Sequence, residues 1–284
     1  MKRILIQLDT DTHASPFDAI AAYDAGVDVV IPYTGVAKDD LAGIVQGAIF
    51  PRGPKGLANT AFWVGGSSVR DGEAVFAAAQ KFFFDPFRAS IMLDSDGCNT
   101  TAAAGLVHVR SAVELKGRKA AVIGVGPVGL RTAELLRREE AEVTVTTFPP
   151  DVLEGEYRRA SGIGVAEEAG FTVVEPDSSD ALDGALEDHP IVFAAGPAGV
   201  QVLRRSGWKD AEVVVDYSAA DPVGVEGVDR GDDLAEEDGV KKLGALAVGA
   251  PKMRLQTACV QKLFETQGVV LDLEGIYDVA LEAL

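Results

Sequence analysis

Apolar and polar residues alternate along the first third of the chain in two patterns. Short apolar runs, typical of buried strands, are separated by segments in which apolar residues recur every three or four positions, as in helices. The predicted strands are residues 3–9, 27–33, 60–66 and 88–96, and the predicted helices are residues 15–26, 38–50 and 70–84. Strands and helices in alternation favour a largely parallel sheet, and hence an α/β fold.

The remainder of the chain repeats this alternation. Residues 100–115 predict a helix, and residues 120–148 predict a strand, a glycine turn, a helix and a second strand. Further strands are predicted at 171–177, 190–199 and 212–222, further helices at 156–170, 179–189, 244–265 and 273–284, and an acidic surface loop at 229–238. With 284 residues, the chain is long enough for two domains.

The net charge of −18 excludes two classes of partner. So acidic a surface repels nucleic acid and anionic membranes, and an anionic cofactor would need a local positive site such as a helix N-terminus. The N-terminal apolar run is too short and mixed for a signal peptide, and no apolar stretch is long enough to span a membrane. We therefore expect a cytoplasmic protein.

Cysteine and histidine spacing indicates neither a disulfide framework nor a metal site. Cys98 and Cys259 form no CxxC motif, and His13, His108 and His189 lie far apart in the sequence. His108 lies within an apolar helix pattern, which is more typical of a packed core residue than of a ligand. We expect no bound metal.

A glycine motif is the strongest single signal. Gly124, Gly126 and Gly129 form G-x-G-x-x-G between an apolar strand and a helix that begins at Pro127 and Val128. The first glycine permits the tight turn, the second lets the backbone approach a pyrophosphate, and the third allows close helix–strand packing. The helix N-terminus would hold the diphosphate, so the motif predicts a Rossmann-type domain that binds NAD or NADP.

The end of the next strand leaves the choice of dinucleotide open. NAD-binding domains usually place Asp or Glu there, and NADP-binding domains often place Arg. This chain has Thr146, Thr147 and Phe148, with Arg158 and Arg159 some way further on. Threonine hydroxyls can bind either a ribose hydroxyl or a phosphate.

Two later loops are expected at the same cleft because each follows an apolar strand. Ligands of open α/β sheets bind at the carboxyl ends of the strands. Ala195 and Gly196 follow one strand, and Asp216, Tyr217 and Ser218 follow the next. We expect these residues on the nicotinamide side, although turn residues of these types are also common without a ligand.

The sequence shows no hydrolase, protease or zinc-enzyme motif, and none of its histidines is a convincing general base. Some hydride transfers need no base. When the hydride leaves a carbon flanked by two nitrogens, the nitrogens stabilise the cation, and the protein has to position the reactants and exclude water.

Residues 93–105, LDSDGCNTTAAAG, crowd polar side chains directly before small ones. The segment is either a helix cap with additional polar side chains or a surface that binds a flat ligand. We expect Asn99 to cap a helix starting at Thr100, which would leave the neighbouring Asp and Thr groups for a ligand. Ala102 to Gly105 would keep that helix slim.

Several of these segments together resemble the bacterial methylene-tetrahydromethanopterin dehydrogenases. The most distinctive blocks are residues 92–105 and 244–252, and the resemblance extends in order over nearly the whole chain. It implies oxidation of methylene-tetrahydromethanopterin, the co-substrate, to the methenyl form, with NADP or NAD accepting the hydride. It also implies a homo-oligomer. Relatives that use NADP carry Arg and Lys after the second strand of the dinucleotide domain, where this chain has Phe-Pro-Pro, so both nucleotides stay open.

The resemblance also implies a fold in which a Rossmann-type domain, residues 111–249, is inserted in a smaller α/β pterin-binding domain with a parallel sheet, residues 1–110 plus 250–284. The match places Asp18, Asp94, Asn99, Thr100 and Thr101 on the pterin side. Lys252 matches the family's active-site lysine. Because a full positive charge would oppose a nascent methenyl cation, we expect this lysine to lie to one side or to be partly neutral.

Three alternatives remain at this stage. A methylene-tetrahydrofolate dehydrogenase or a dihydropterin-reducing relative would need much the same residues. A dinucleotide-sensing protein without catalysis would bind the nucleotide and turn over no pterin.

Overall fold

The chain forms two compact units in a computed structural model that describes residues 1–153 and 162–284. Unit 1 comprises Met1–Thr100 and Met253–Leu284, and unit 2 comprises Thr101–Lys252. The two boundaries fall inside helices α5 (Cys98–Arg110) and α9 (Ala245–Leu263). The assignment of a pterin-binding and a dinucleotide-binding role to domains with the predicted limits stays a prediction. Arg158 and Arg159 lie outside the described residues.

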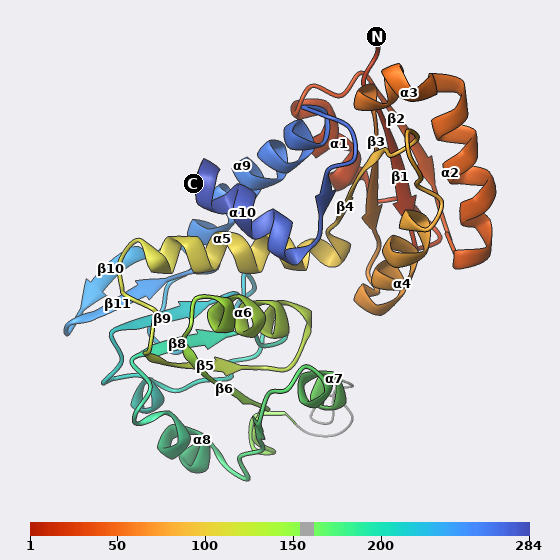
Figure 1. Cartoon of the computed structure of the whole chain (residues 1–284). Coiled ribbons are helices and arrows are strands. Elements are labelled where there is room, and N and C mark those ends of the chain that lie inside the picture. The colour runs from red at the N-terminus through yellow and green to blue at the C-terminus, as the bar shows by residue number, and fades with distance from the viewer. Residues whose placement is uncertain (154–161) are drawn as a thin grey trace. The chain divides into compact units, whose positions relative to one another are not determined.

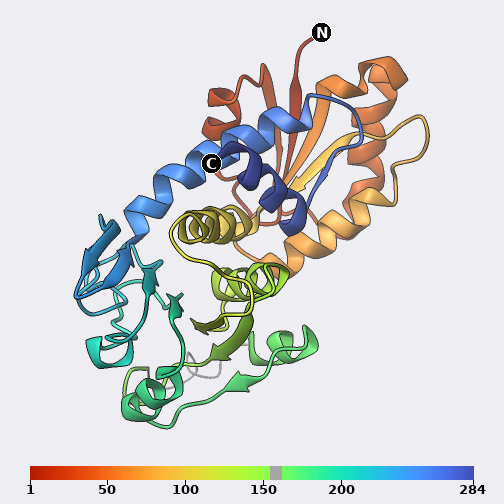
Figure 2. The ribbon, with the colours of Figure 1, turned by 60° about the vertical axis from the view of Figure 1, so that its left-hand side comes forward.

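Unit 1 is built on a parallel five-stranded sheet in the order β12-β4-β3-β1-β2. Its strands are β1 (Ile4–Asp9), β2 (Val29–Tyr33), β3 (Thr60–Gly65), β4 (Ser90–Leu93) and β12 (Val270–Leu271). Its remaining α-helices are α1 (Pro16–Asp24), α2 (Leu41–Ile49), α3 (Gly53–Gly56), α4 (Val69–Gln80) and α10 (Leu273–Ala283). Alternate strand residues such as Ile6 and Phe62 pack with Val45 of α2 and Val75 of α4 in one core on one face. Helices α1 and α10 lie on the other side of the strands (Figures 1 and 2).

Unit 2 contains a seven-stranded sheet in the order β10-β11-β9-β8-β5-β6-β7. Its strands are β5 (Lys119–Ile123), β6 (Glu142–Thr146), β7 (Val173–Val174), β8 (Ile191–Ala194), β9 (Val213–Asp216), β10 (Asp233–Glu237) and β11 (Val240–Leu243). Its other α-helices are α6 (Pro127–Arg138), α7 (Gly162–Glu168) and α8 (Ser179–Leu186). The chain starts at β5, adds β6 and β7 on one side and returns to add β8 and β9 on the other. This is the strand order of dinucleotide-binding folds, and its switch point lies between β5 and β8.

The acidic segment 229–238 does not form the predicted loop. Its second half is β10, which pairs antiparallel with β11 at the edge of the sheet. Lys242 of β11 is buried, and its Nζ lies 3.3 Å from Asp232 Oδ2 and 2.9 Å from Glu237 Oε2, so two of the acidic groups are ion-pair partners. Asp238 and Gly239 both have positive φ, as tight hairpin turns require. The Asp-Gly pair is the sequence signal that predicts this hairpin.

Candidate functional site

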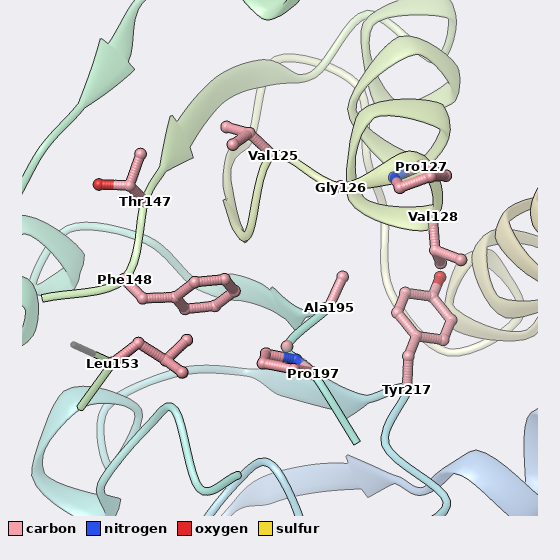
Figure 3. Close-up of a pocket in the computed structure, with 11 residues that line it drawn as sticks. Val125, Gly126, Pro127, Val128, Thr147, Phe148, Leu153, Ala195, Pro197 and Tyr217 are labelled. Carbon is pink, nitrogen blue, oxygen red and sulfur yellow. The ribbon is translucent and has the colours of Figure 1, made fainter. Parts of the chain in front are cut away.

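A cavity of about 310 Å³ lies at the carboxyl ends of β5, β6 and β8 (Figure 3). This is the switch point of the unit 2 sheet, where open α/β sheets bind their ligands. The cavity is lined by Val125, Gly126, Pro127, Val128, Thr147, Phe148, Leu153, Ala195, Gly196, Pro197 and Tyr217. None of these described lining residues carries a charge.

The three motif glycines shape the loop as their positions predict. Gly124 has φ +110°, and a Cβ there would lie 2.5 Å from the carbonyl oxygen of Ala195. A Cβ on Gly129 would overlap the Gly124 carbonyl, so α6 packs against the loop because this residue has no side chain. At Gly126 a Cβ would meet no atom within 4 Å. The backbone is therefore open at Gly126, directly before the N-terminus of α6, where a diphosphate is best stabilised.

The residues predicted to bind the cofactor divide into two groups. Six of them line the cavity: Gly126, Pro127, Val128, Thr147, Ala195 and Gly196. Gly124 and Gly129 stand behind the loop. Asp216 is buried, and its carboxylate accepts hydrogen bonds from the backbone N–H groups of Ser218 (2.8 Å), Gly224 (2.7 Å) and Val225 (3.0 Å).

Asp216 therefore folds the loop that follows β9. Burial raises the pKa of Asp216, and its three N–H donors act in the opposite direction. Ser218 is buried beside it. Binding of a cofactor by Asp216 or Ser218 stays a prediction, whereas their part in the loop is visible in the structure.

Several cavity residues carry no motif in the sequence. Val125, Leu153 and Pro197 line the cavity although no spacing rule singles them out. Phe148 is 8% exposed, and its ring lies against the position where Gly124 would carry a Cβ. Tyr217, which was expected at this cleft because it follows a strand, forms another wall. Hydrophobic lining of this kind is fixed by tertiary packing, which local sequence does not reveal.

In unit 1, the segment after β4 is tied together by its own polar groups. Asp94 is 2% exposed and accepts hydrogen bonds from Thr100 N (3.1 Å), Thr100 Oγ1 (2.7 Å) and Gln256 Nε2 (3.1 Å). Gln256 belongs to α9, so this carboxylate joins the start of α5 to a distant helix of the same unit. Much of the hydrogen-bonding capacity that the sequence suggested for a ligand is used inside the protein.

The prediction that Asn99 caps a helix starting at Thr100 is wrong. A 3₁₀ turn, Ser95–Gly97, leads directly into α5, which begins at Cys98 and so contains Asn99. The Asn99 Nδ2 donates to the carbonyl of Leu93 (2.7 Å). Asp94 performs the capping instead, because its carboxylate accepts the Thr100 N–H.

Asp18 lies near the end of another strand of unit 1. Its backbone N–H donates to the hydroxyl of Ser15, the N-cap of α1 (3.3 Å). A Cβ on Gly65, the last residue of β3, would lie 2.8 Å from Asp18 Oδ2. Asp18 and the Asp94 group thus occupy the carboxyl edge of one sheet. Thr101 and Lys252 belong to unit 2, and Lys252 lies well inside α9, directly after Pro251.

The three histidines lie in different surroundings. His108 is not a packed core residue as predicted: it is partly exposed, and its Nε2 lies 2.7 Å from Asp233 Oδ1. His189 Nε2 lies 2.9 Å from Thr144 Oγ1, and His13 is exposed. No cluster suited to a metal ion occurs among residues 1–153 and 162–284. Within the same residues, no helix has the length and hydrophobicity needed to cross a membrane.

A cavity at the switch point of a sheet with this strand order defines an NAD(P)-binding α/β protein. Residues 111–215 match a family described as "Putative NAD(P)-binding", and residues 16–96 match "Methylene-tetrahydromethanopterin dehydrogenase, N-terminal". The chain belongs to the methylene-tetrahydromethanopterin dehydrogenase family, as two relatives show. It is 40% identical over 287 residues to "Bifunctional protein MdtA" of Methylorubrum extorquens, covering 99% of both chains. It is 31% identical over 298 residues to the "NAD(P)-dependent methylenetetrahydromethanopterin dehydrogenase" of that organism, covering 99% and 98%.

A solved structure confirms the fold. The N5,N10-methylenetetrahydrofolate dehydrogenase-cyclohydrolase of Trypanosoma brucei superposes with a TM-score of 0.52 at 15% identity, covering 99% of this chain and 88% of the other. The predicted α/β fold with a Rossmann-type domain between flanking segments is therefore confirmed, as is the predicted family. The protein is an enzyme of an oxidoreductase family of one-carbon metabolism.

Proposed function

We propose that this enzyme transfers a hydride from methylene-tetrahydromethanopterin to NAD(P)⁺ and releases methenyl-tetrahydromethanopterin. The observation that carries the proposal is the uncharged cavity that the glycine loop lines, in a chain that belongs to this family. The methylene carbon loses one hydrogen with both bonding electrons, and C4 of the nicotinamide gains them. The two flanking nitrogens delocalise the resulting positive charge, so no proton has to be removed.

The cavity residues supply binding and orientation. Gly126, Pro127 and Val128 hold the diphosphate at the N-terminus of α6. Thr147 follows β6 and contacts the adenosine ribose in this proposal, and Ala195 and Gly196 lie towards the nicotinamide. With no carboxylate on the described wall to repel a 2′-phosphate, we propose that both NAD and NADP are accepted.

The pterin is held at the carboxyl edge of the unit 1 sheet in this proposal. Asp18 and Thr101 contact the ring, while Asp94, Asn99 and Thr100 fix the segment that carries Thr101. Lys252 donates to a pterin oxygen and stays to one side of the reacting carbon, because a cation beside the nascent methenyl group would raise the barrier. As the resemblance implies, the working enzyme is a homo-oligomer.

A two-by-two assay tests the proposal. Purified enzyme is given the methylene form of tetrahydromethanopterin or of tetrahydrofolate, each with NAD⁺ or NADP⁺, and the methenyl product is followed by absorbance. Turnover with the methanopterin carrier supports the proposal, and turnover confined to the folate carrier replaces it with the folate alternative. Binding of dinucleotide without turnover on either carrier identifies a dinucleotide sensor instead.

Two variants test the residue roles. Asp18→Asn and Lys252→Met should each lower kcat/KM for the carrier at least about tenfold, as the loss of a charge-assisted contact does, while the Kd for dinucleotide stays unchanged. Unchanged kcat/KM in both variants would show that the pterin site is assigned to the wrong residues. The assignment of the dinucleotide site would not be affected.

A further inference from the structure

Tyr217 stands at one end of the cavity in unit 2. It follows β9 directly, its backbone N–H donates to the carbonyl of Ala194 (3.1 Å), and its side chain lines the cavity. Figure 3 shows its ring across the cavity from Phe148 and Leu153, with the hydroxyl directed towards Val128 in the first turn of α6. The two aromatic side chains therefore mark opposite ends of the space.

A chain of two hydrogen bonds fixes the Tyr217 hydroxyl. Its oxygen lies 3.2 Å from Thr132 Oγ1, which lies 2.9 Å from the carbonyl oxygen of Val128. A hydroxyl has one proton to donate, and a carbonyl can only accept. Thr132 therefore donates to Val128, and Tyr217 donates to Thr132. Desolvation raises the pKa of Tyr217, so the phenol keeps its proton at neutral pH.

The ring itself is fixed from two sides. It stacks on Phe193 of β8 with a centroid distance of 6.0 Å and an interplanar angle of 24°. It also lies against Gly105 of α5, where a Cβ would come within 2.5 Å of the Tyr217 oxygen and 2.8 Å of Cε1. A glycine is thus required at position 105 for the ring to take this place. A side chain held by three elements is a rigid wall.

The two ends of a bound dinucleotide can be assigned from the sheet. The adenosine half lies beside the second strand of such folds, here β6, and the nicotinamide half lies beside β8 and β9. Thr147 and Phe148 follow β6, and Tyr217 follows β9. We infer that Tyr217 is the wall against which the nicotinamide ring rests, held in place by the hydrogen-bond chain from Thr132 to Val128.

This inference rests on the proposed dinucleotide site but needs no particular pterin. Tyr217 is a positioning residue in this account: an uncharged aromatic ring covers one side of the nicotinamide and leaves the other side for the hydride donor. Because the same chain ends at the first turn of α6, the nicotinamide wall and the diphosphate-binding turn keep a fixed spacing.

Binding of three probes to Tyr217→Leu tests the wall. Leucine keeps apolar volume but removes the flat ring. Isothermal titration with NAD⁺, NADP⁺ and ADP-ribose, which lacks nicotinamide, should show the Kd for both dinucleotides raised about tenfold, as the loss of an aromatic pair allows. The Kd for ADP-ribose should stay within about twofold. An equal loss for ADP-ribose, or no loss for any probe, would overturn the inference.

The hydrogen-bond chain is tested by Tyr217→Phe and Thr132→Val, which keep volume and so preserve folding. Each single variant should raise the dinucleotide Kd about threefold to fivefold. The double variant should raise the Kd no further than the more affected single variant does, because both substitutions remove the same hydrogen bond. Additive losses would show that the two residues act separately and would refute the chain. Since these readouts are binding constants without a carrier, they stay informative even if the turnover assay fails.

Discussion

Loss of the Thr100 hydroxyl alone should lower the stability of unit 1. It is completely buried and donates to the Asp94 carboxylate at 2.7 Å. Thr100→Val keeps the shape and leaves that charge with one donor fewer, so we expect the free energy of unfolding to fall by about 1.5–3 kcal/mol. Urea unfolding followed by circular dichroism measures it.

Thr257 provides the matched control for this prediction. It lies in α9, is partly exposed, and its hydroxyl donates to the carbonyl of Met253 in its own helix. Thr257→Val should change the unfolding free energy by no more than about 0.5 kcal/mol. If the two variants lost the same stability, the Asp94 cluster would not be a special support of the fold.

His189 links the stability of unit 2 to pH. Its pKa is lowered, mainly by burial and also by the nearby Lys119 charge. The unfolded chain therefore takes up a proton near the ordinary histidine pKa of about 6.5 while the folded chain resists it. This part of the stability is fully present above about pH 6.5 and is lost as the pH falls through the lowered pKa.

His189→Gln removes the titrating group and should flatten the curve of unfolding free energy between about pH 7.5 and about 5.5. The measurement is urea unfolding across this range, with His13→Gln, at an exposed position, as the control that keeps the wild-type slope. A slope that His189→Gln leaves unchanged would contradict the assignment.

At the scale of elements, features fixed by local sequence were predictable, and features that depend on residues far apart in the chain were not. The glycine loop before α6 was predictable because backbone conformation and close packing restrict Gly124 and Gly129 to glycine. The role of Asp94 was not, because its partner Gln256 lies 162 residues away. The strand β10 was missed although the Asp238-Gly239 pair is a local signal for its hairpin turn. Its acidic side chains were interpreted as those of a solvated loop, whereas Glu237 pairs with Lys242 on the neighbouring strand.

The edge strand β2 is protected from pairing with another sheet. Val29 N donates to the Arg3 carbonyl on the β1 side, so the next N–H along, that of Val30, points outward, as does position 32. The Val30 N–H donates to the Tyr23 hydroxyl (3.3 Å), and Pro32 has no N–H. The outer edge of the strand therefore offers neither donor to a neighbour.

Restoring a backbone N–H at position 32 should allow this edge to pair with a strand of another molecule. We expect Pro32→Val to form soluble aggregates at concentrations where the wild-type protein keeps its native oligomeric state. The reason is that an exposed strand with a free N–H is a template for pairing with another strand. Multi-angle light scattering over a concentration series measures this. Ile31→Val, on the same exposed strand but with its N–H facing β1, is the control and should behave as wild type.

At the scale of the molecule, the two units contain separate hydrophobic cores, one around β1, β3, α2 and α4 and one around β8, β9 and α8. The order of these elements was predictable from hydrophobic periodicity. The hydrophobic wall of the cavity was predictable only in part. Tyr217 was expected at this cleft because it follows β9, whereas Leu153 and Pro197 join the wall only when the strands are assembled.

Because the cavity residues all belong to unit 2, dinucleotide binding should stabilise the two units unequally. At a concentration of about one hundred times Kd, NADP⁺ adds about 2.7 kcal/mol to any opening that destroys its site. Hydrogen exchange should therefore slow by up to about one hundredfold in β5, β8 and β9, and far less in β1, β3 and β4. ADP-ribose should give the same pattern, except at Tyr217 and its neighbours, where protection should require the nicotinamide. Equal slowing in both units would mean that the chain opens as one cooperative body, and the binding energy would then belong to the whole protein rather than to the unit that holds the cavity.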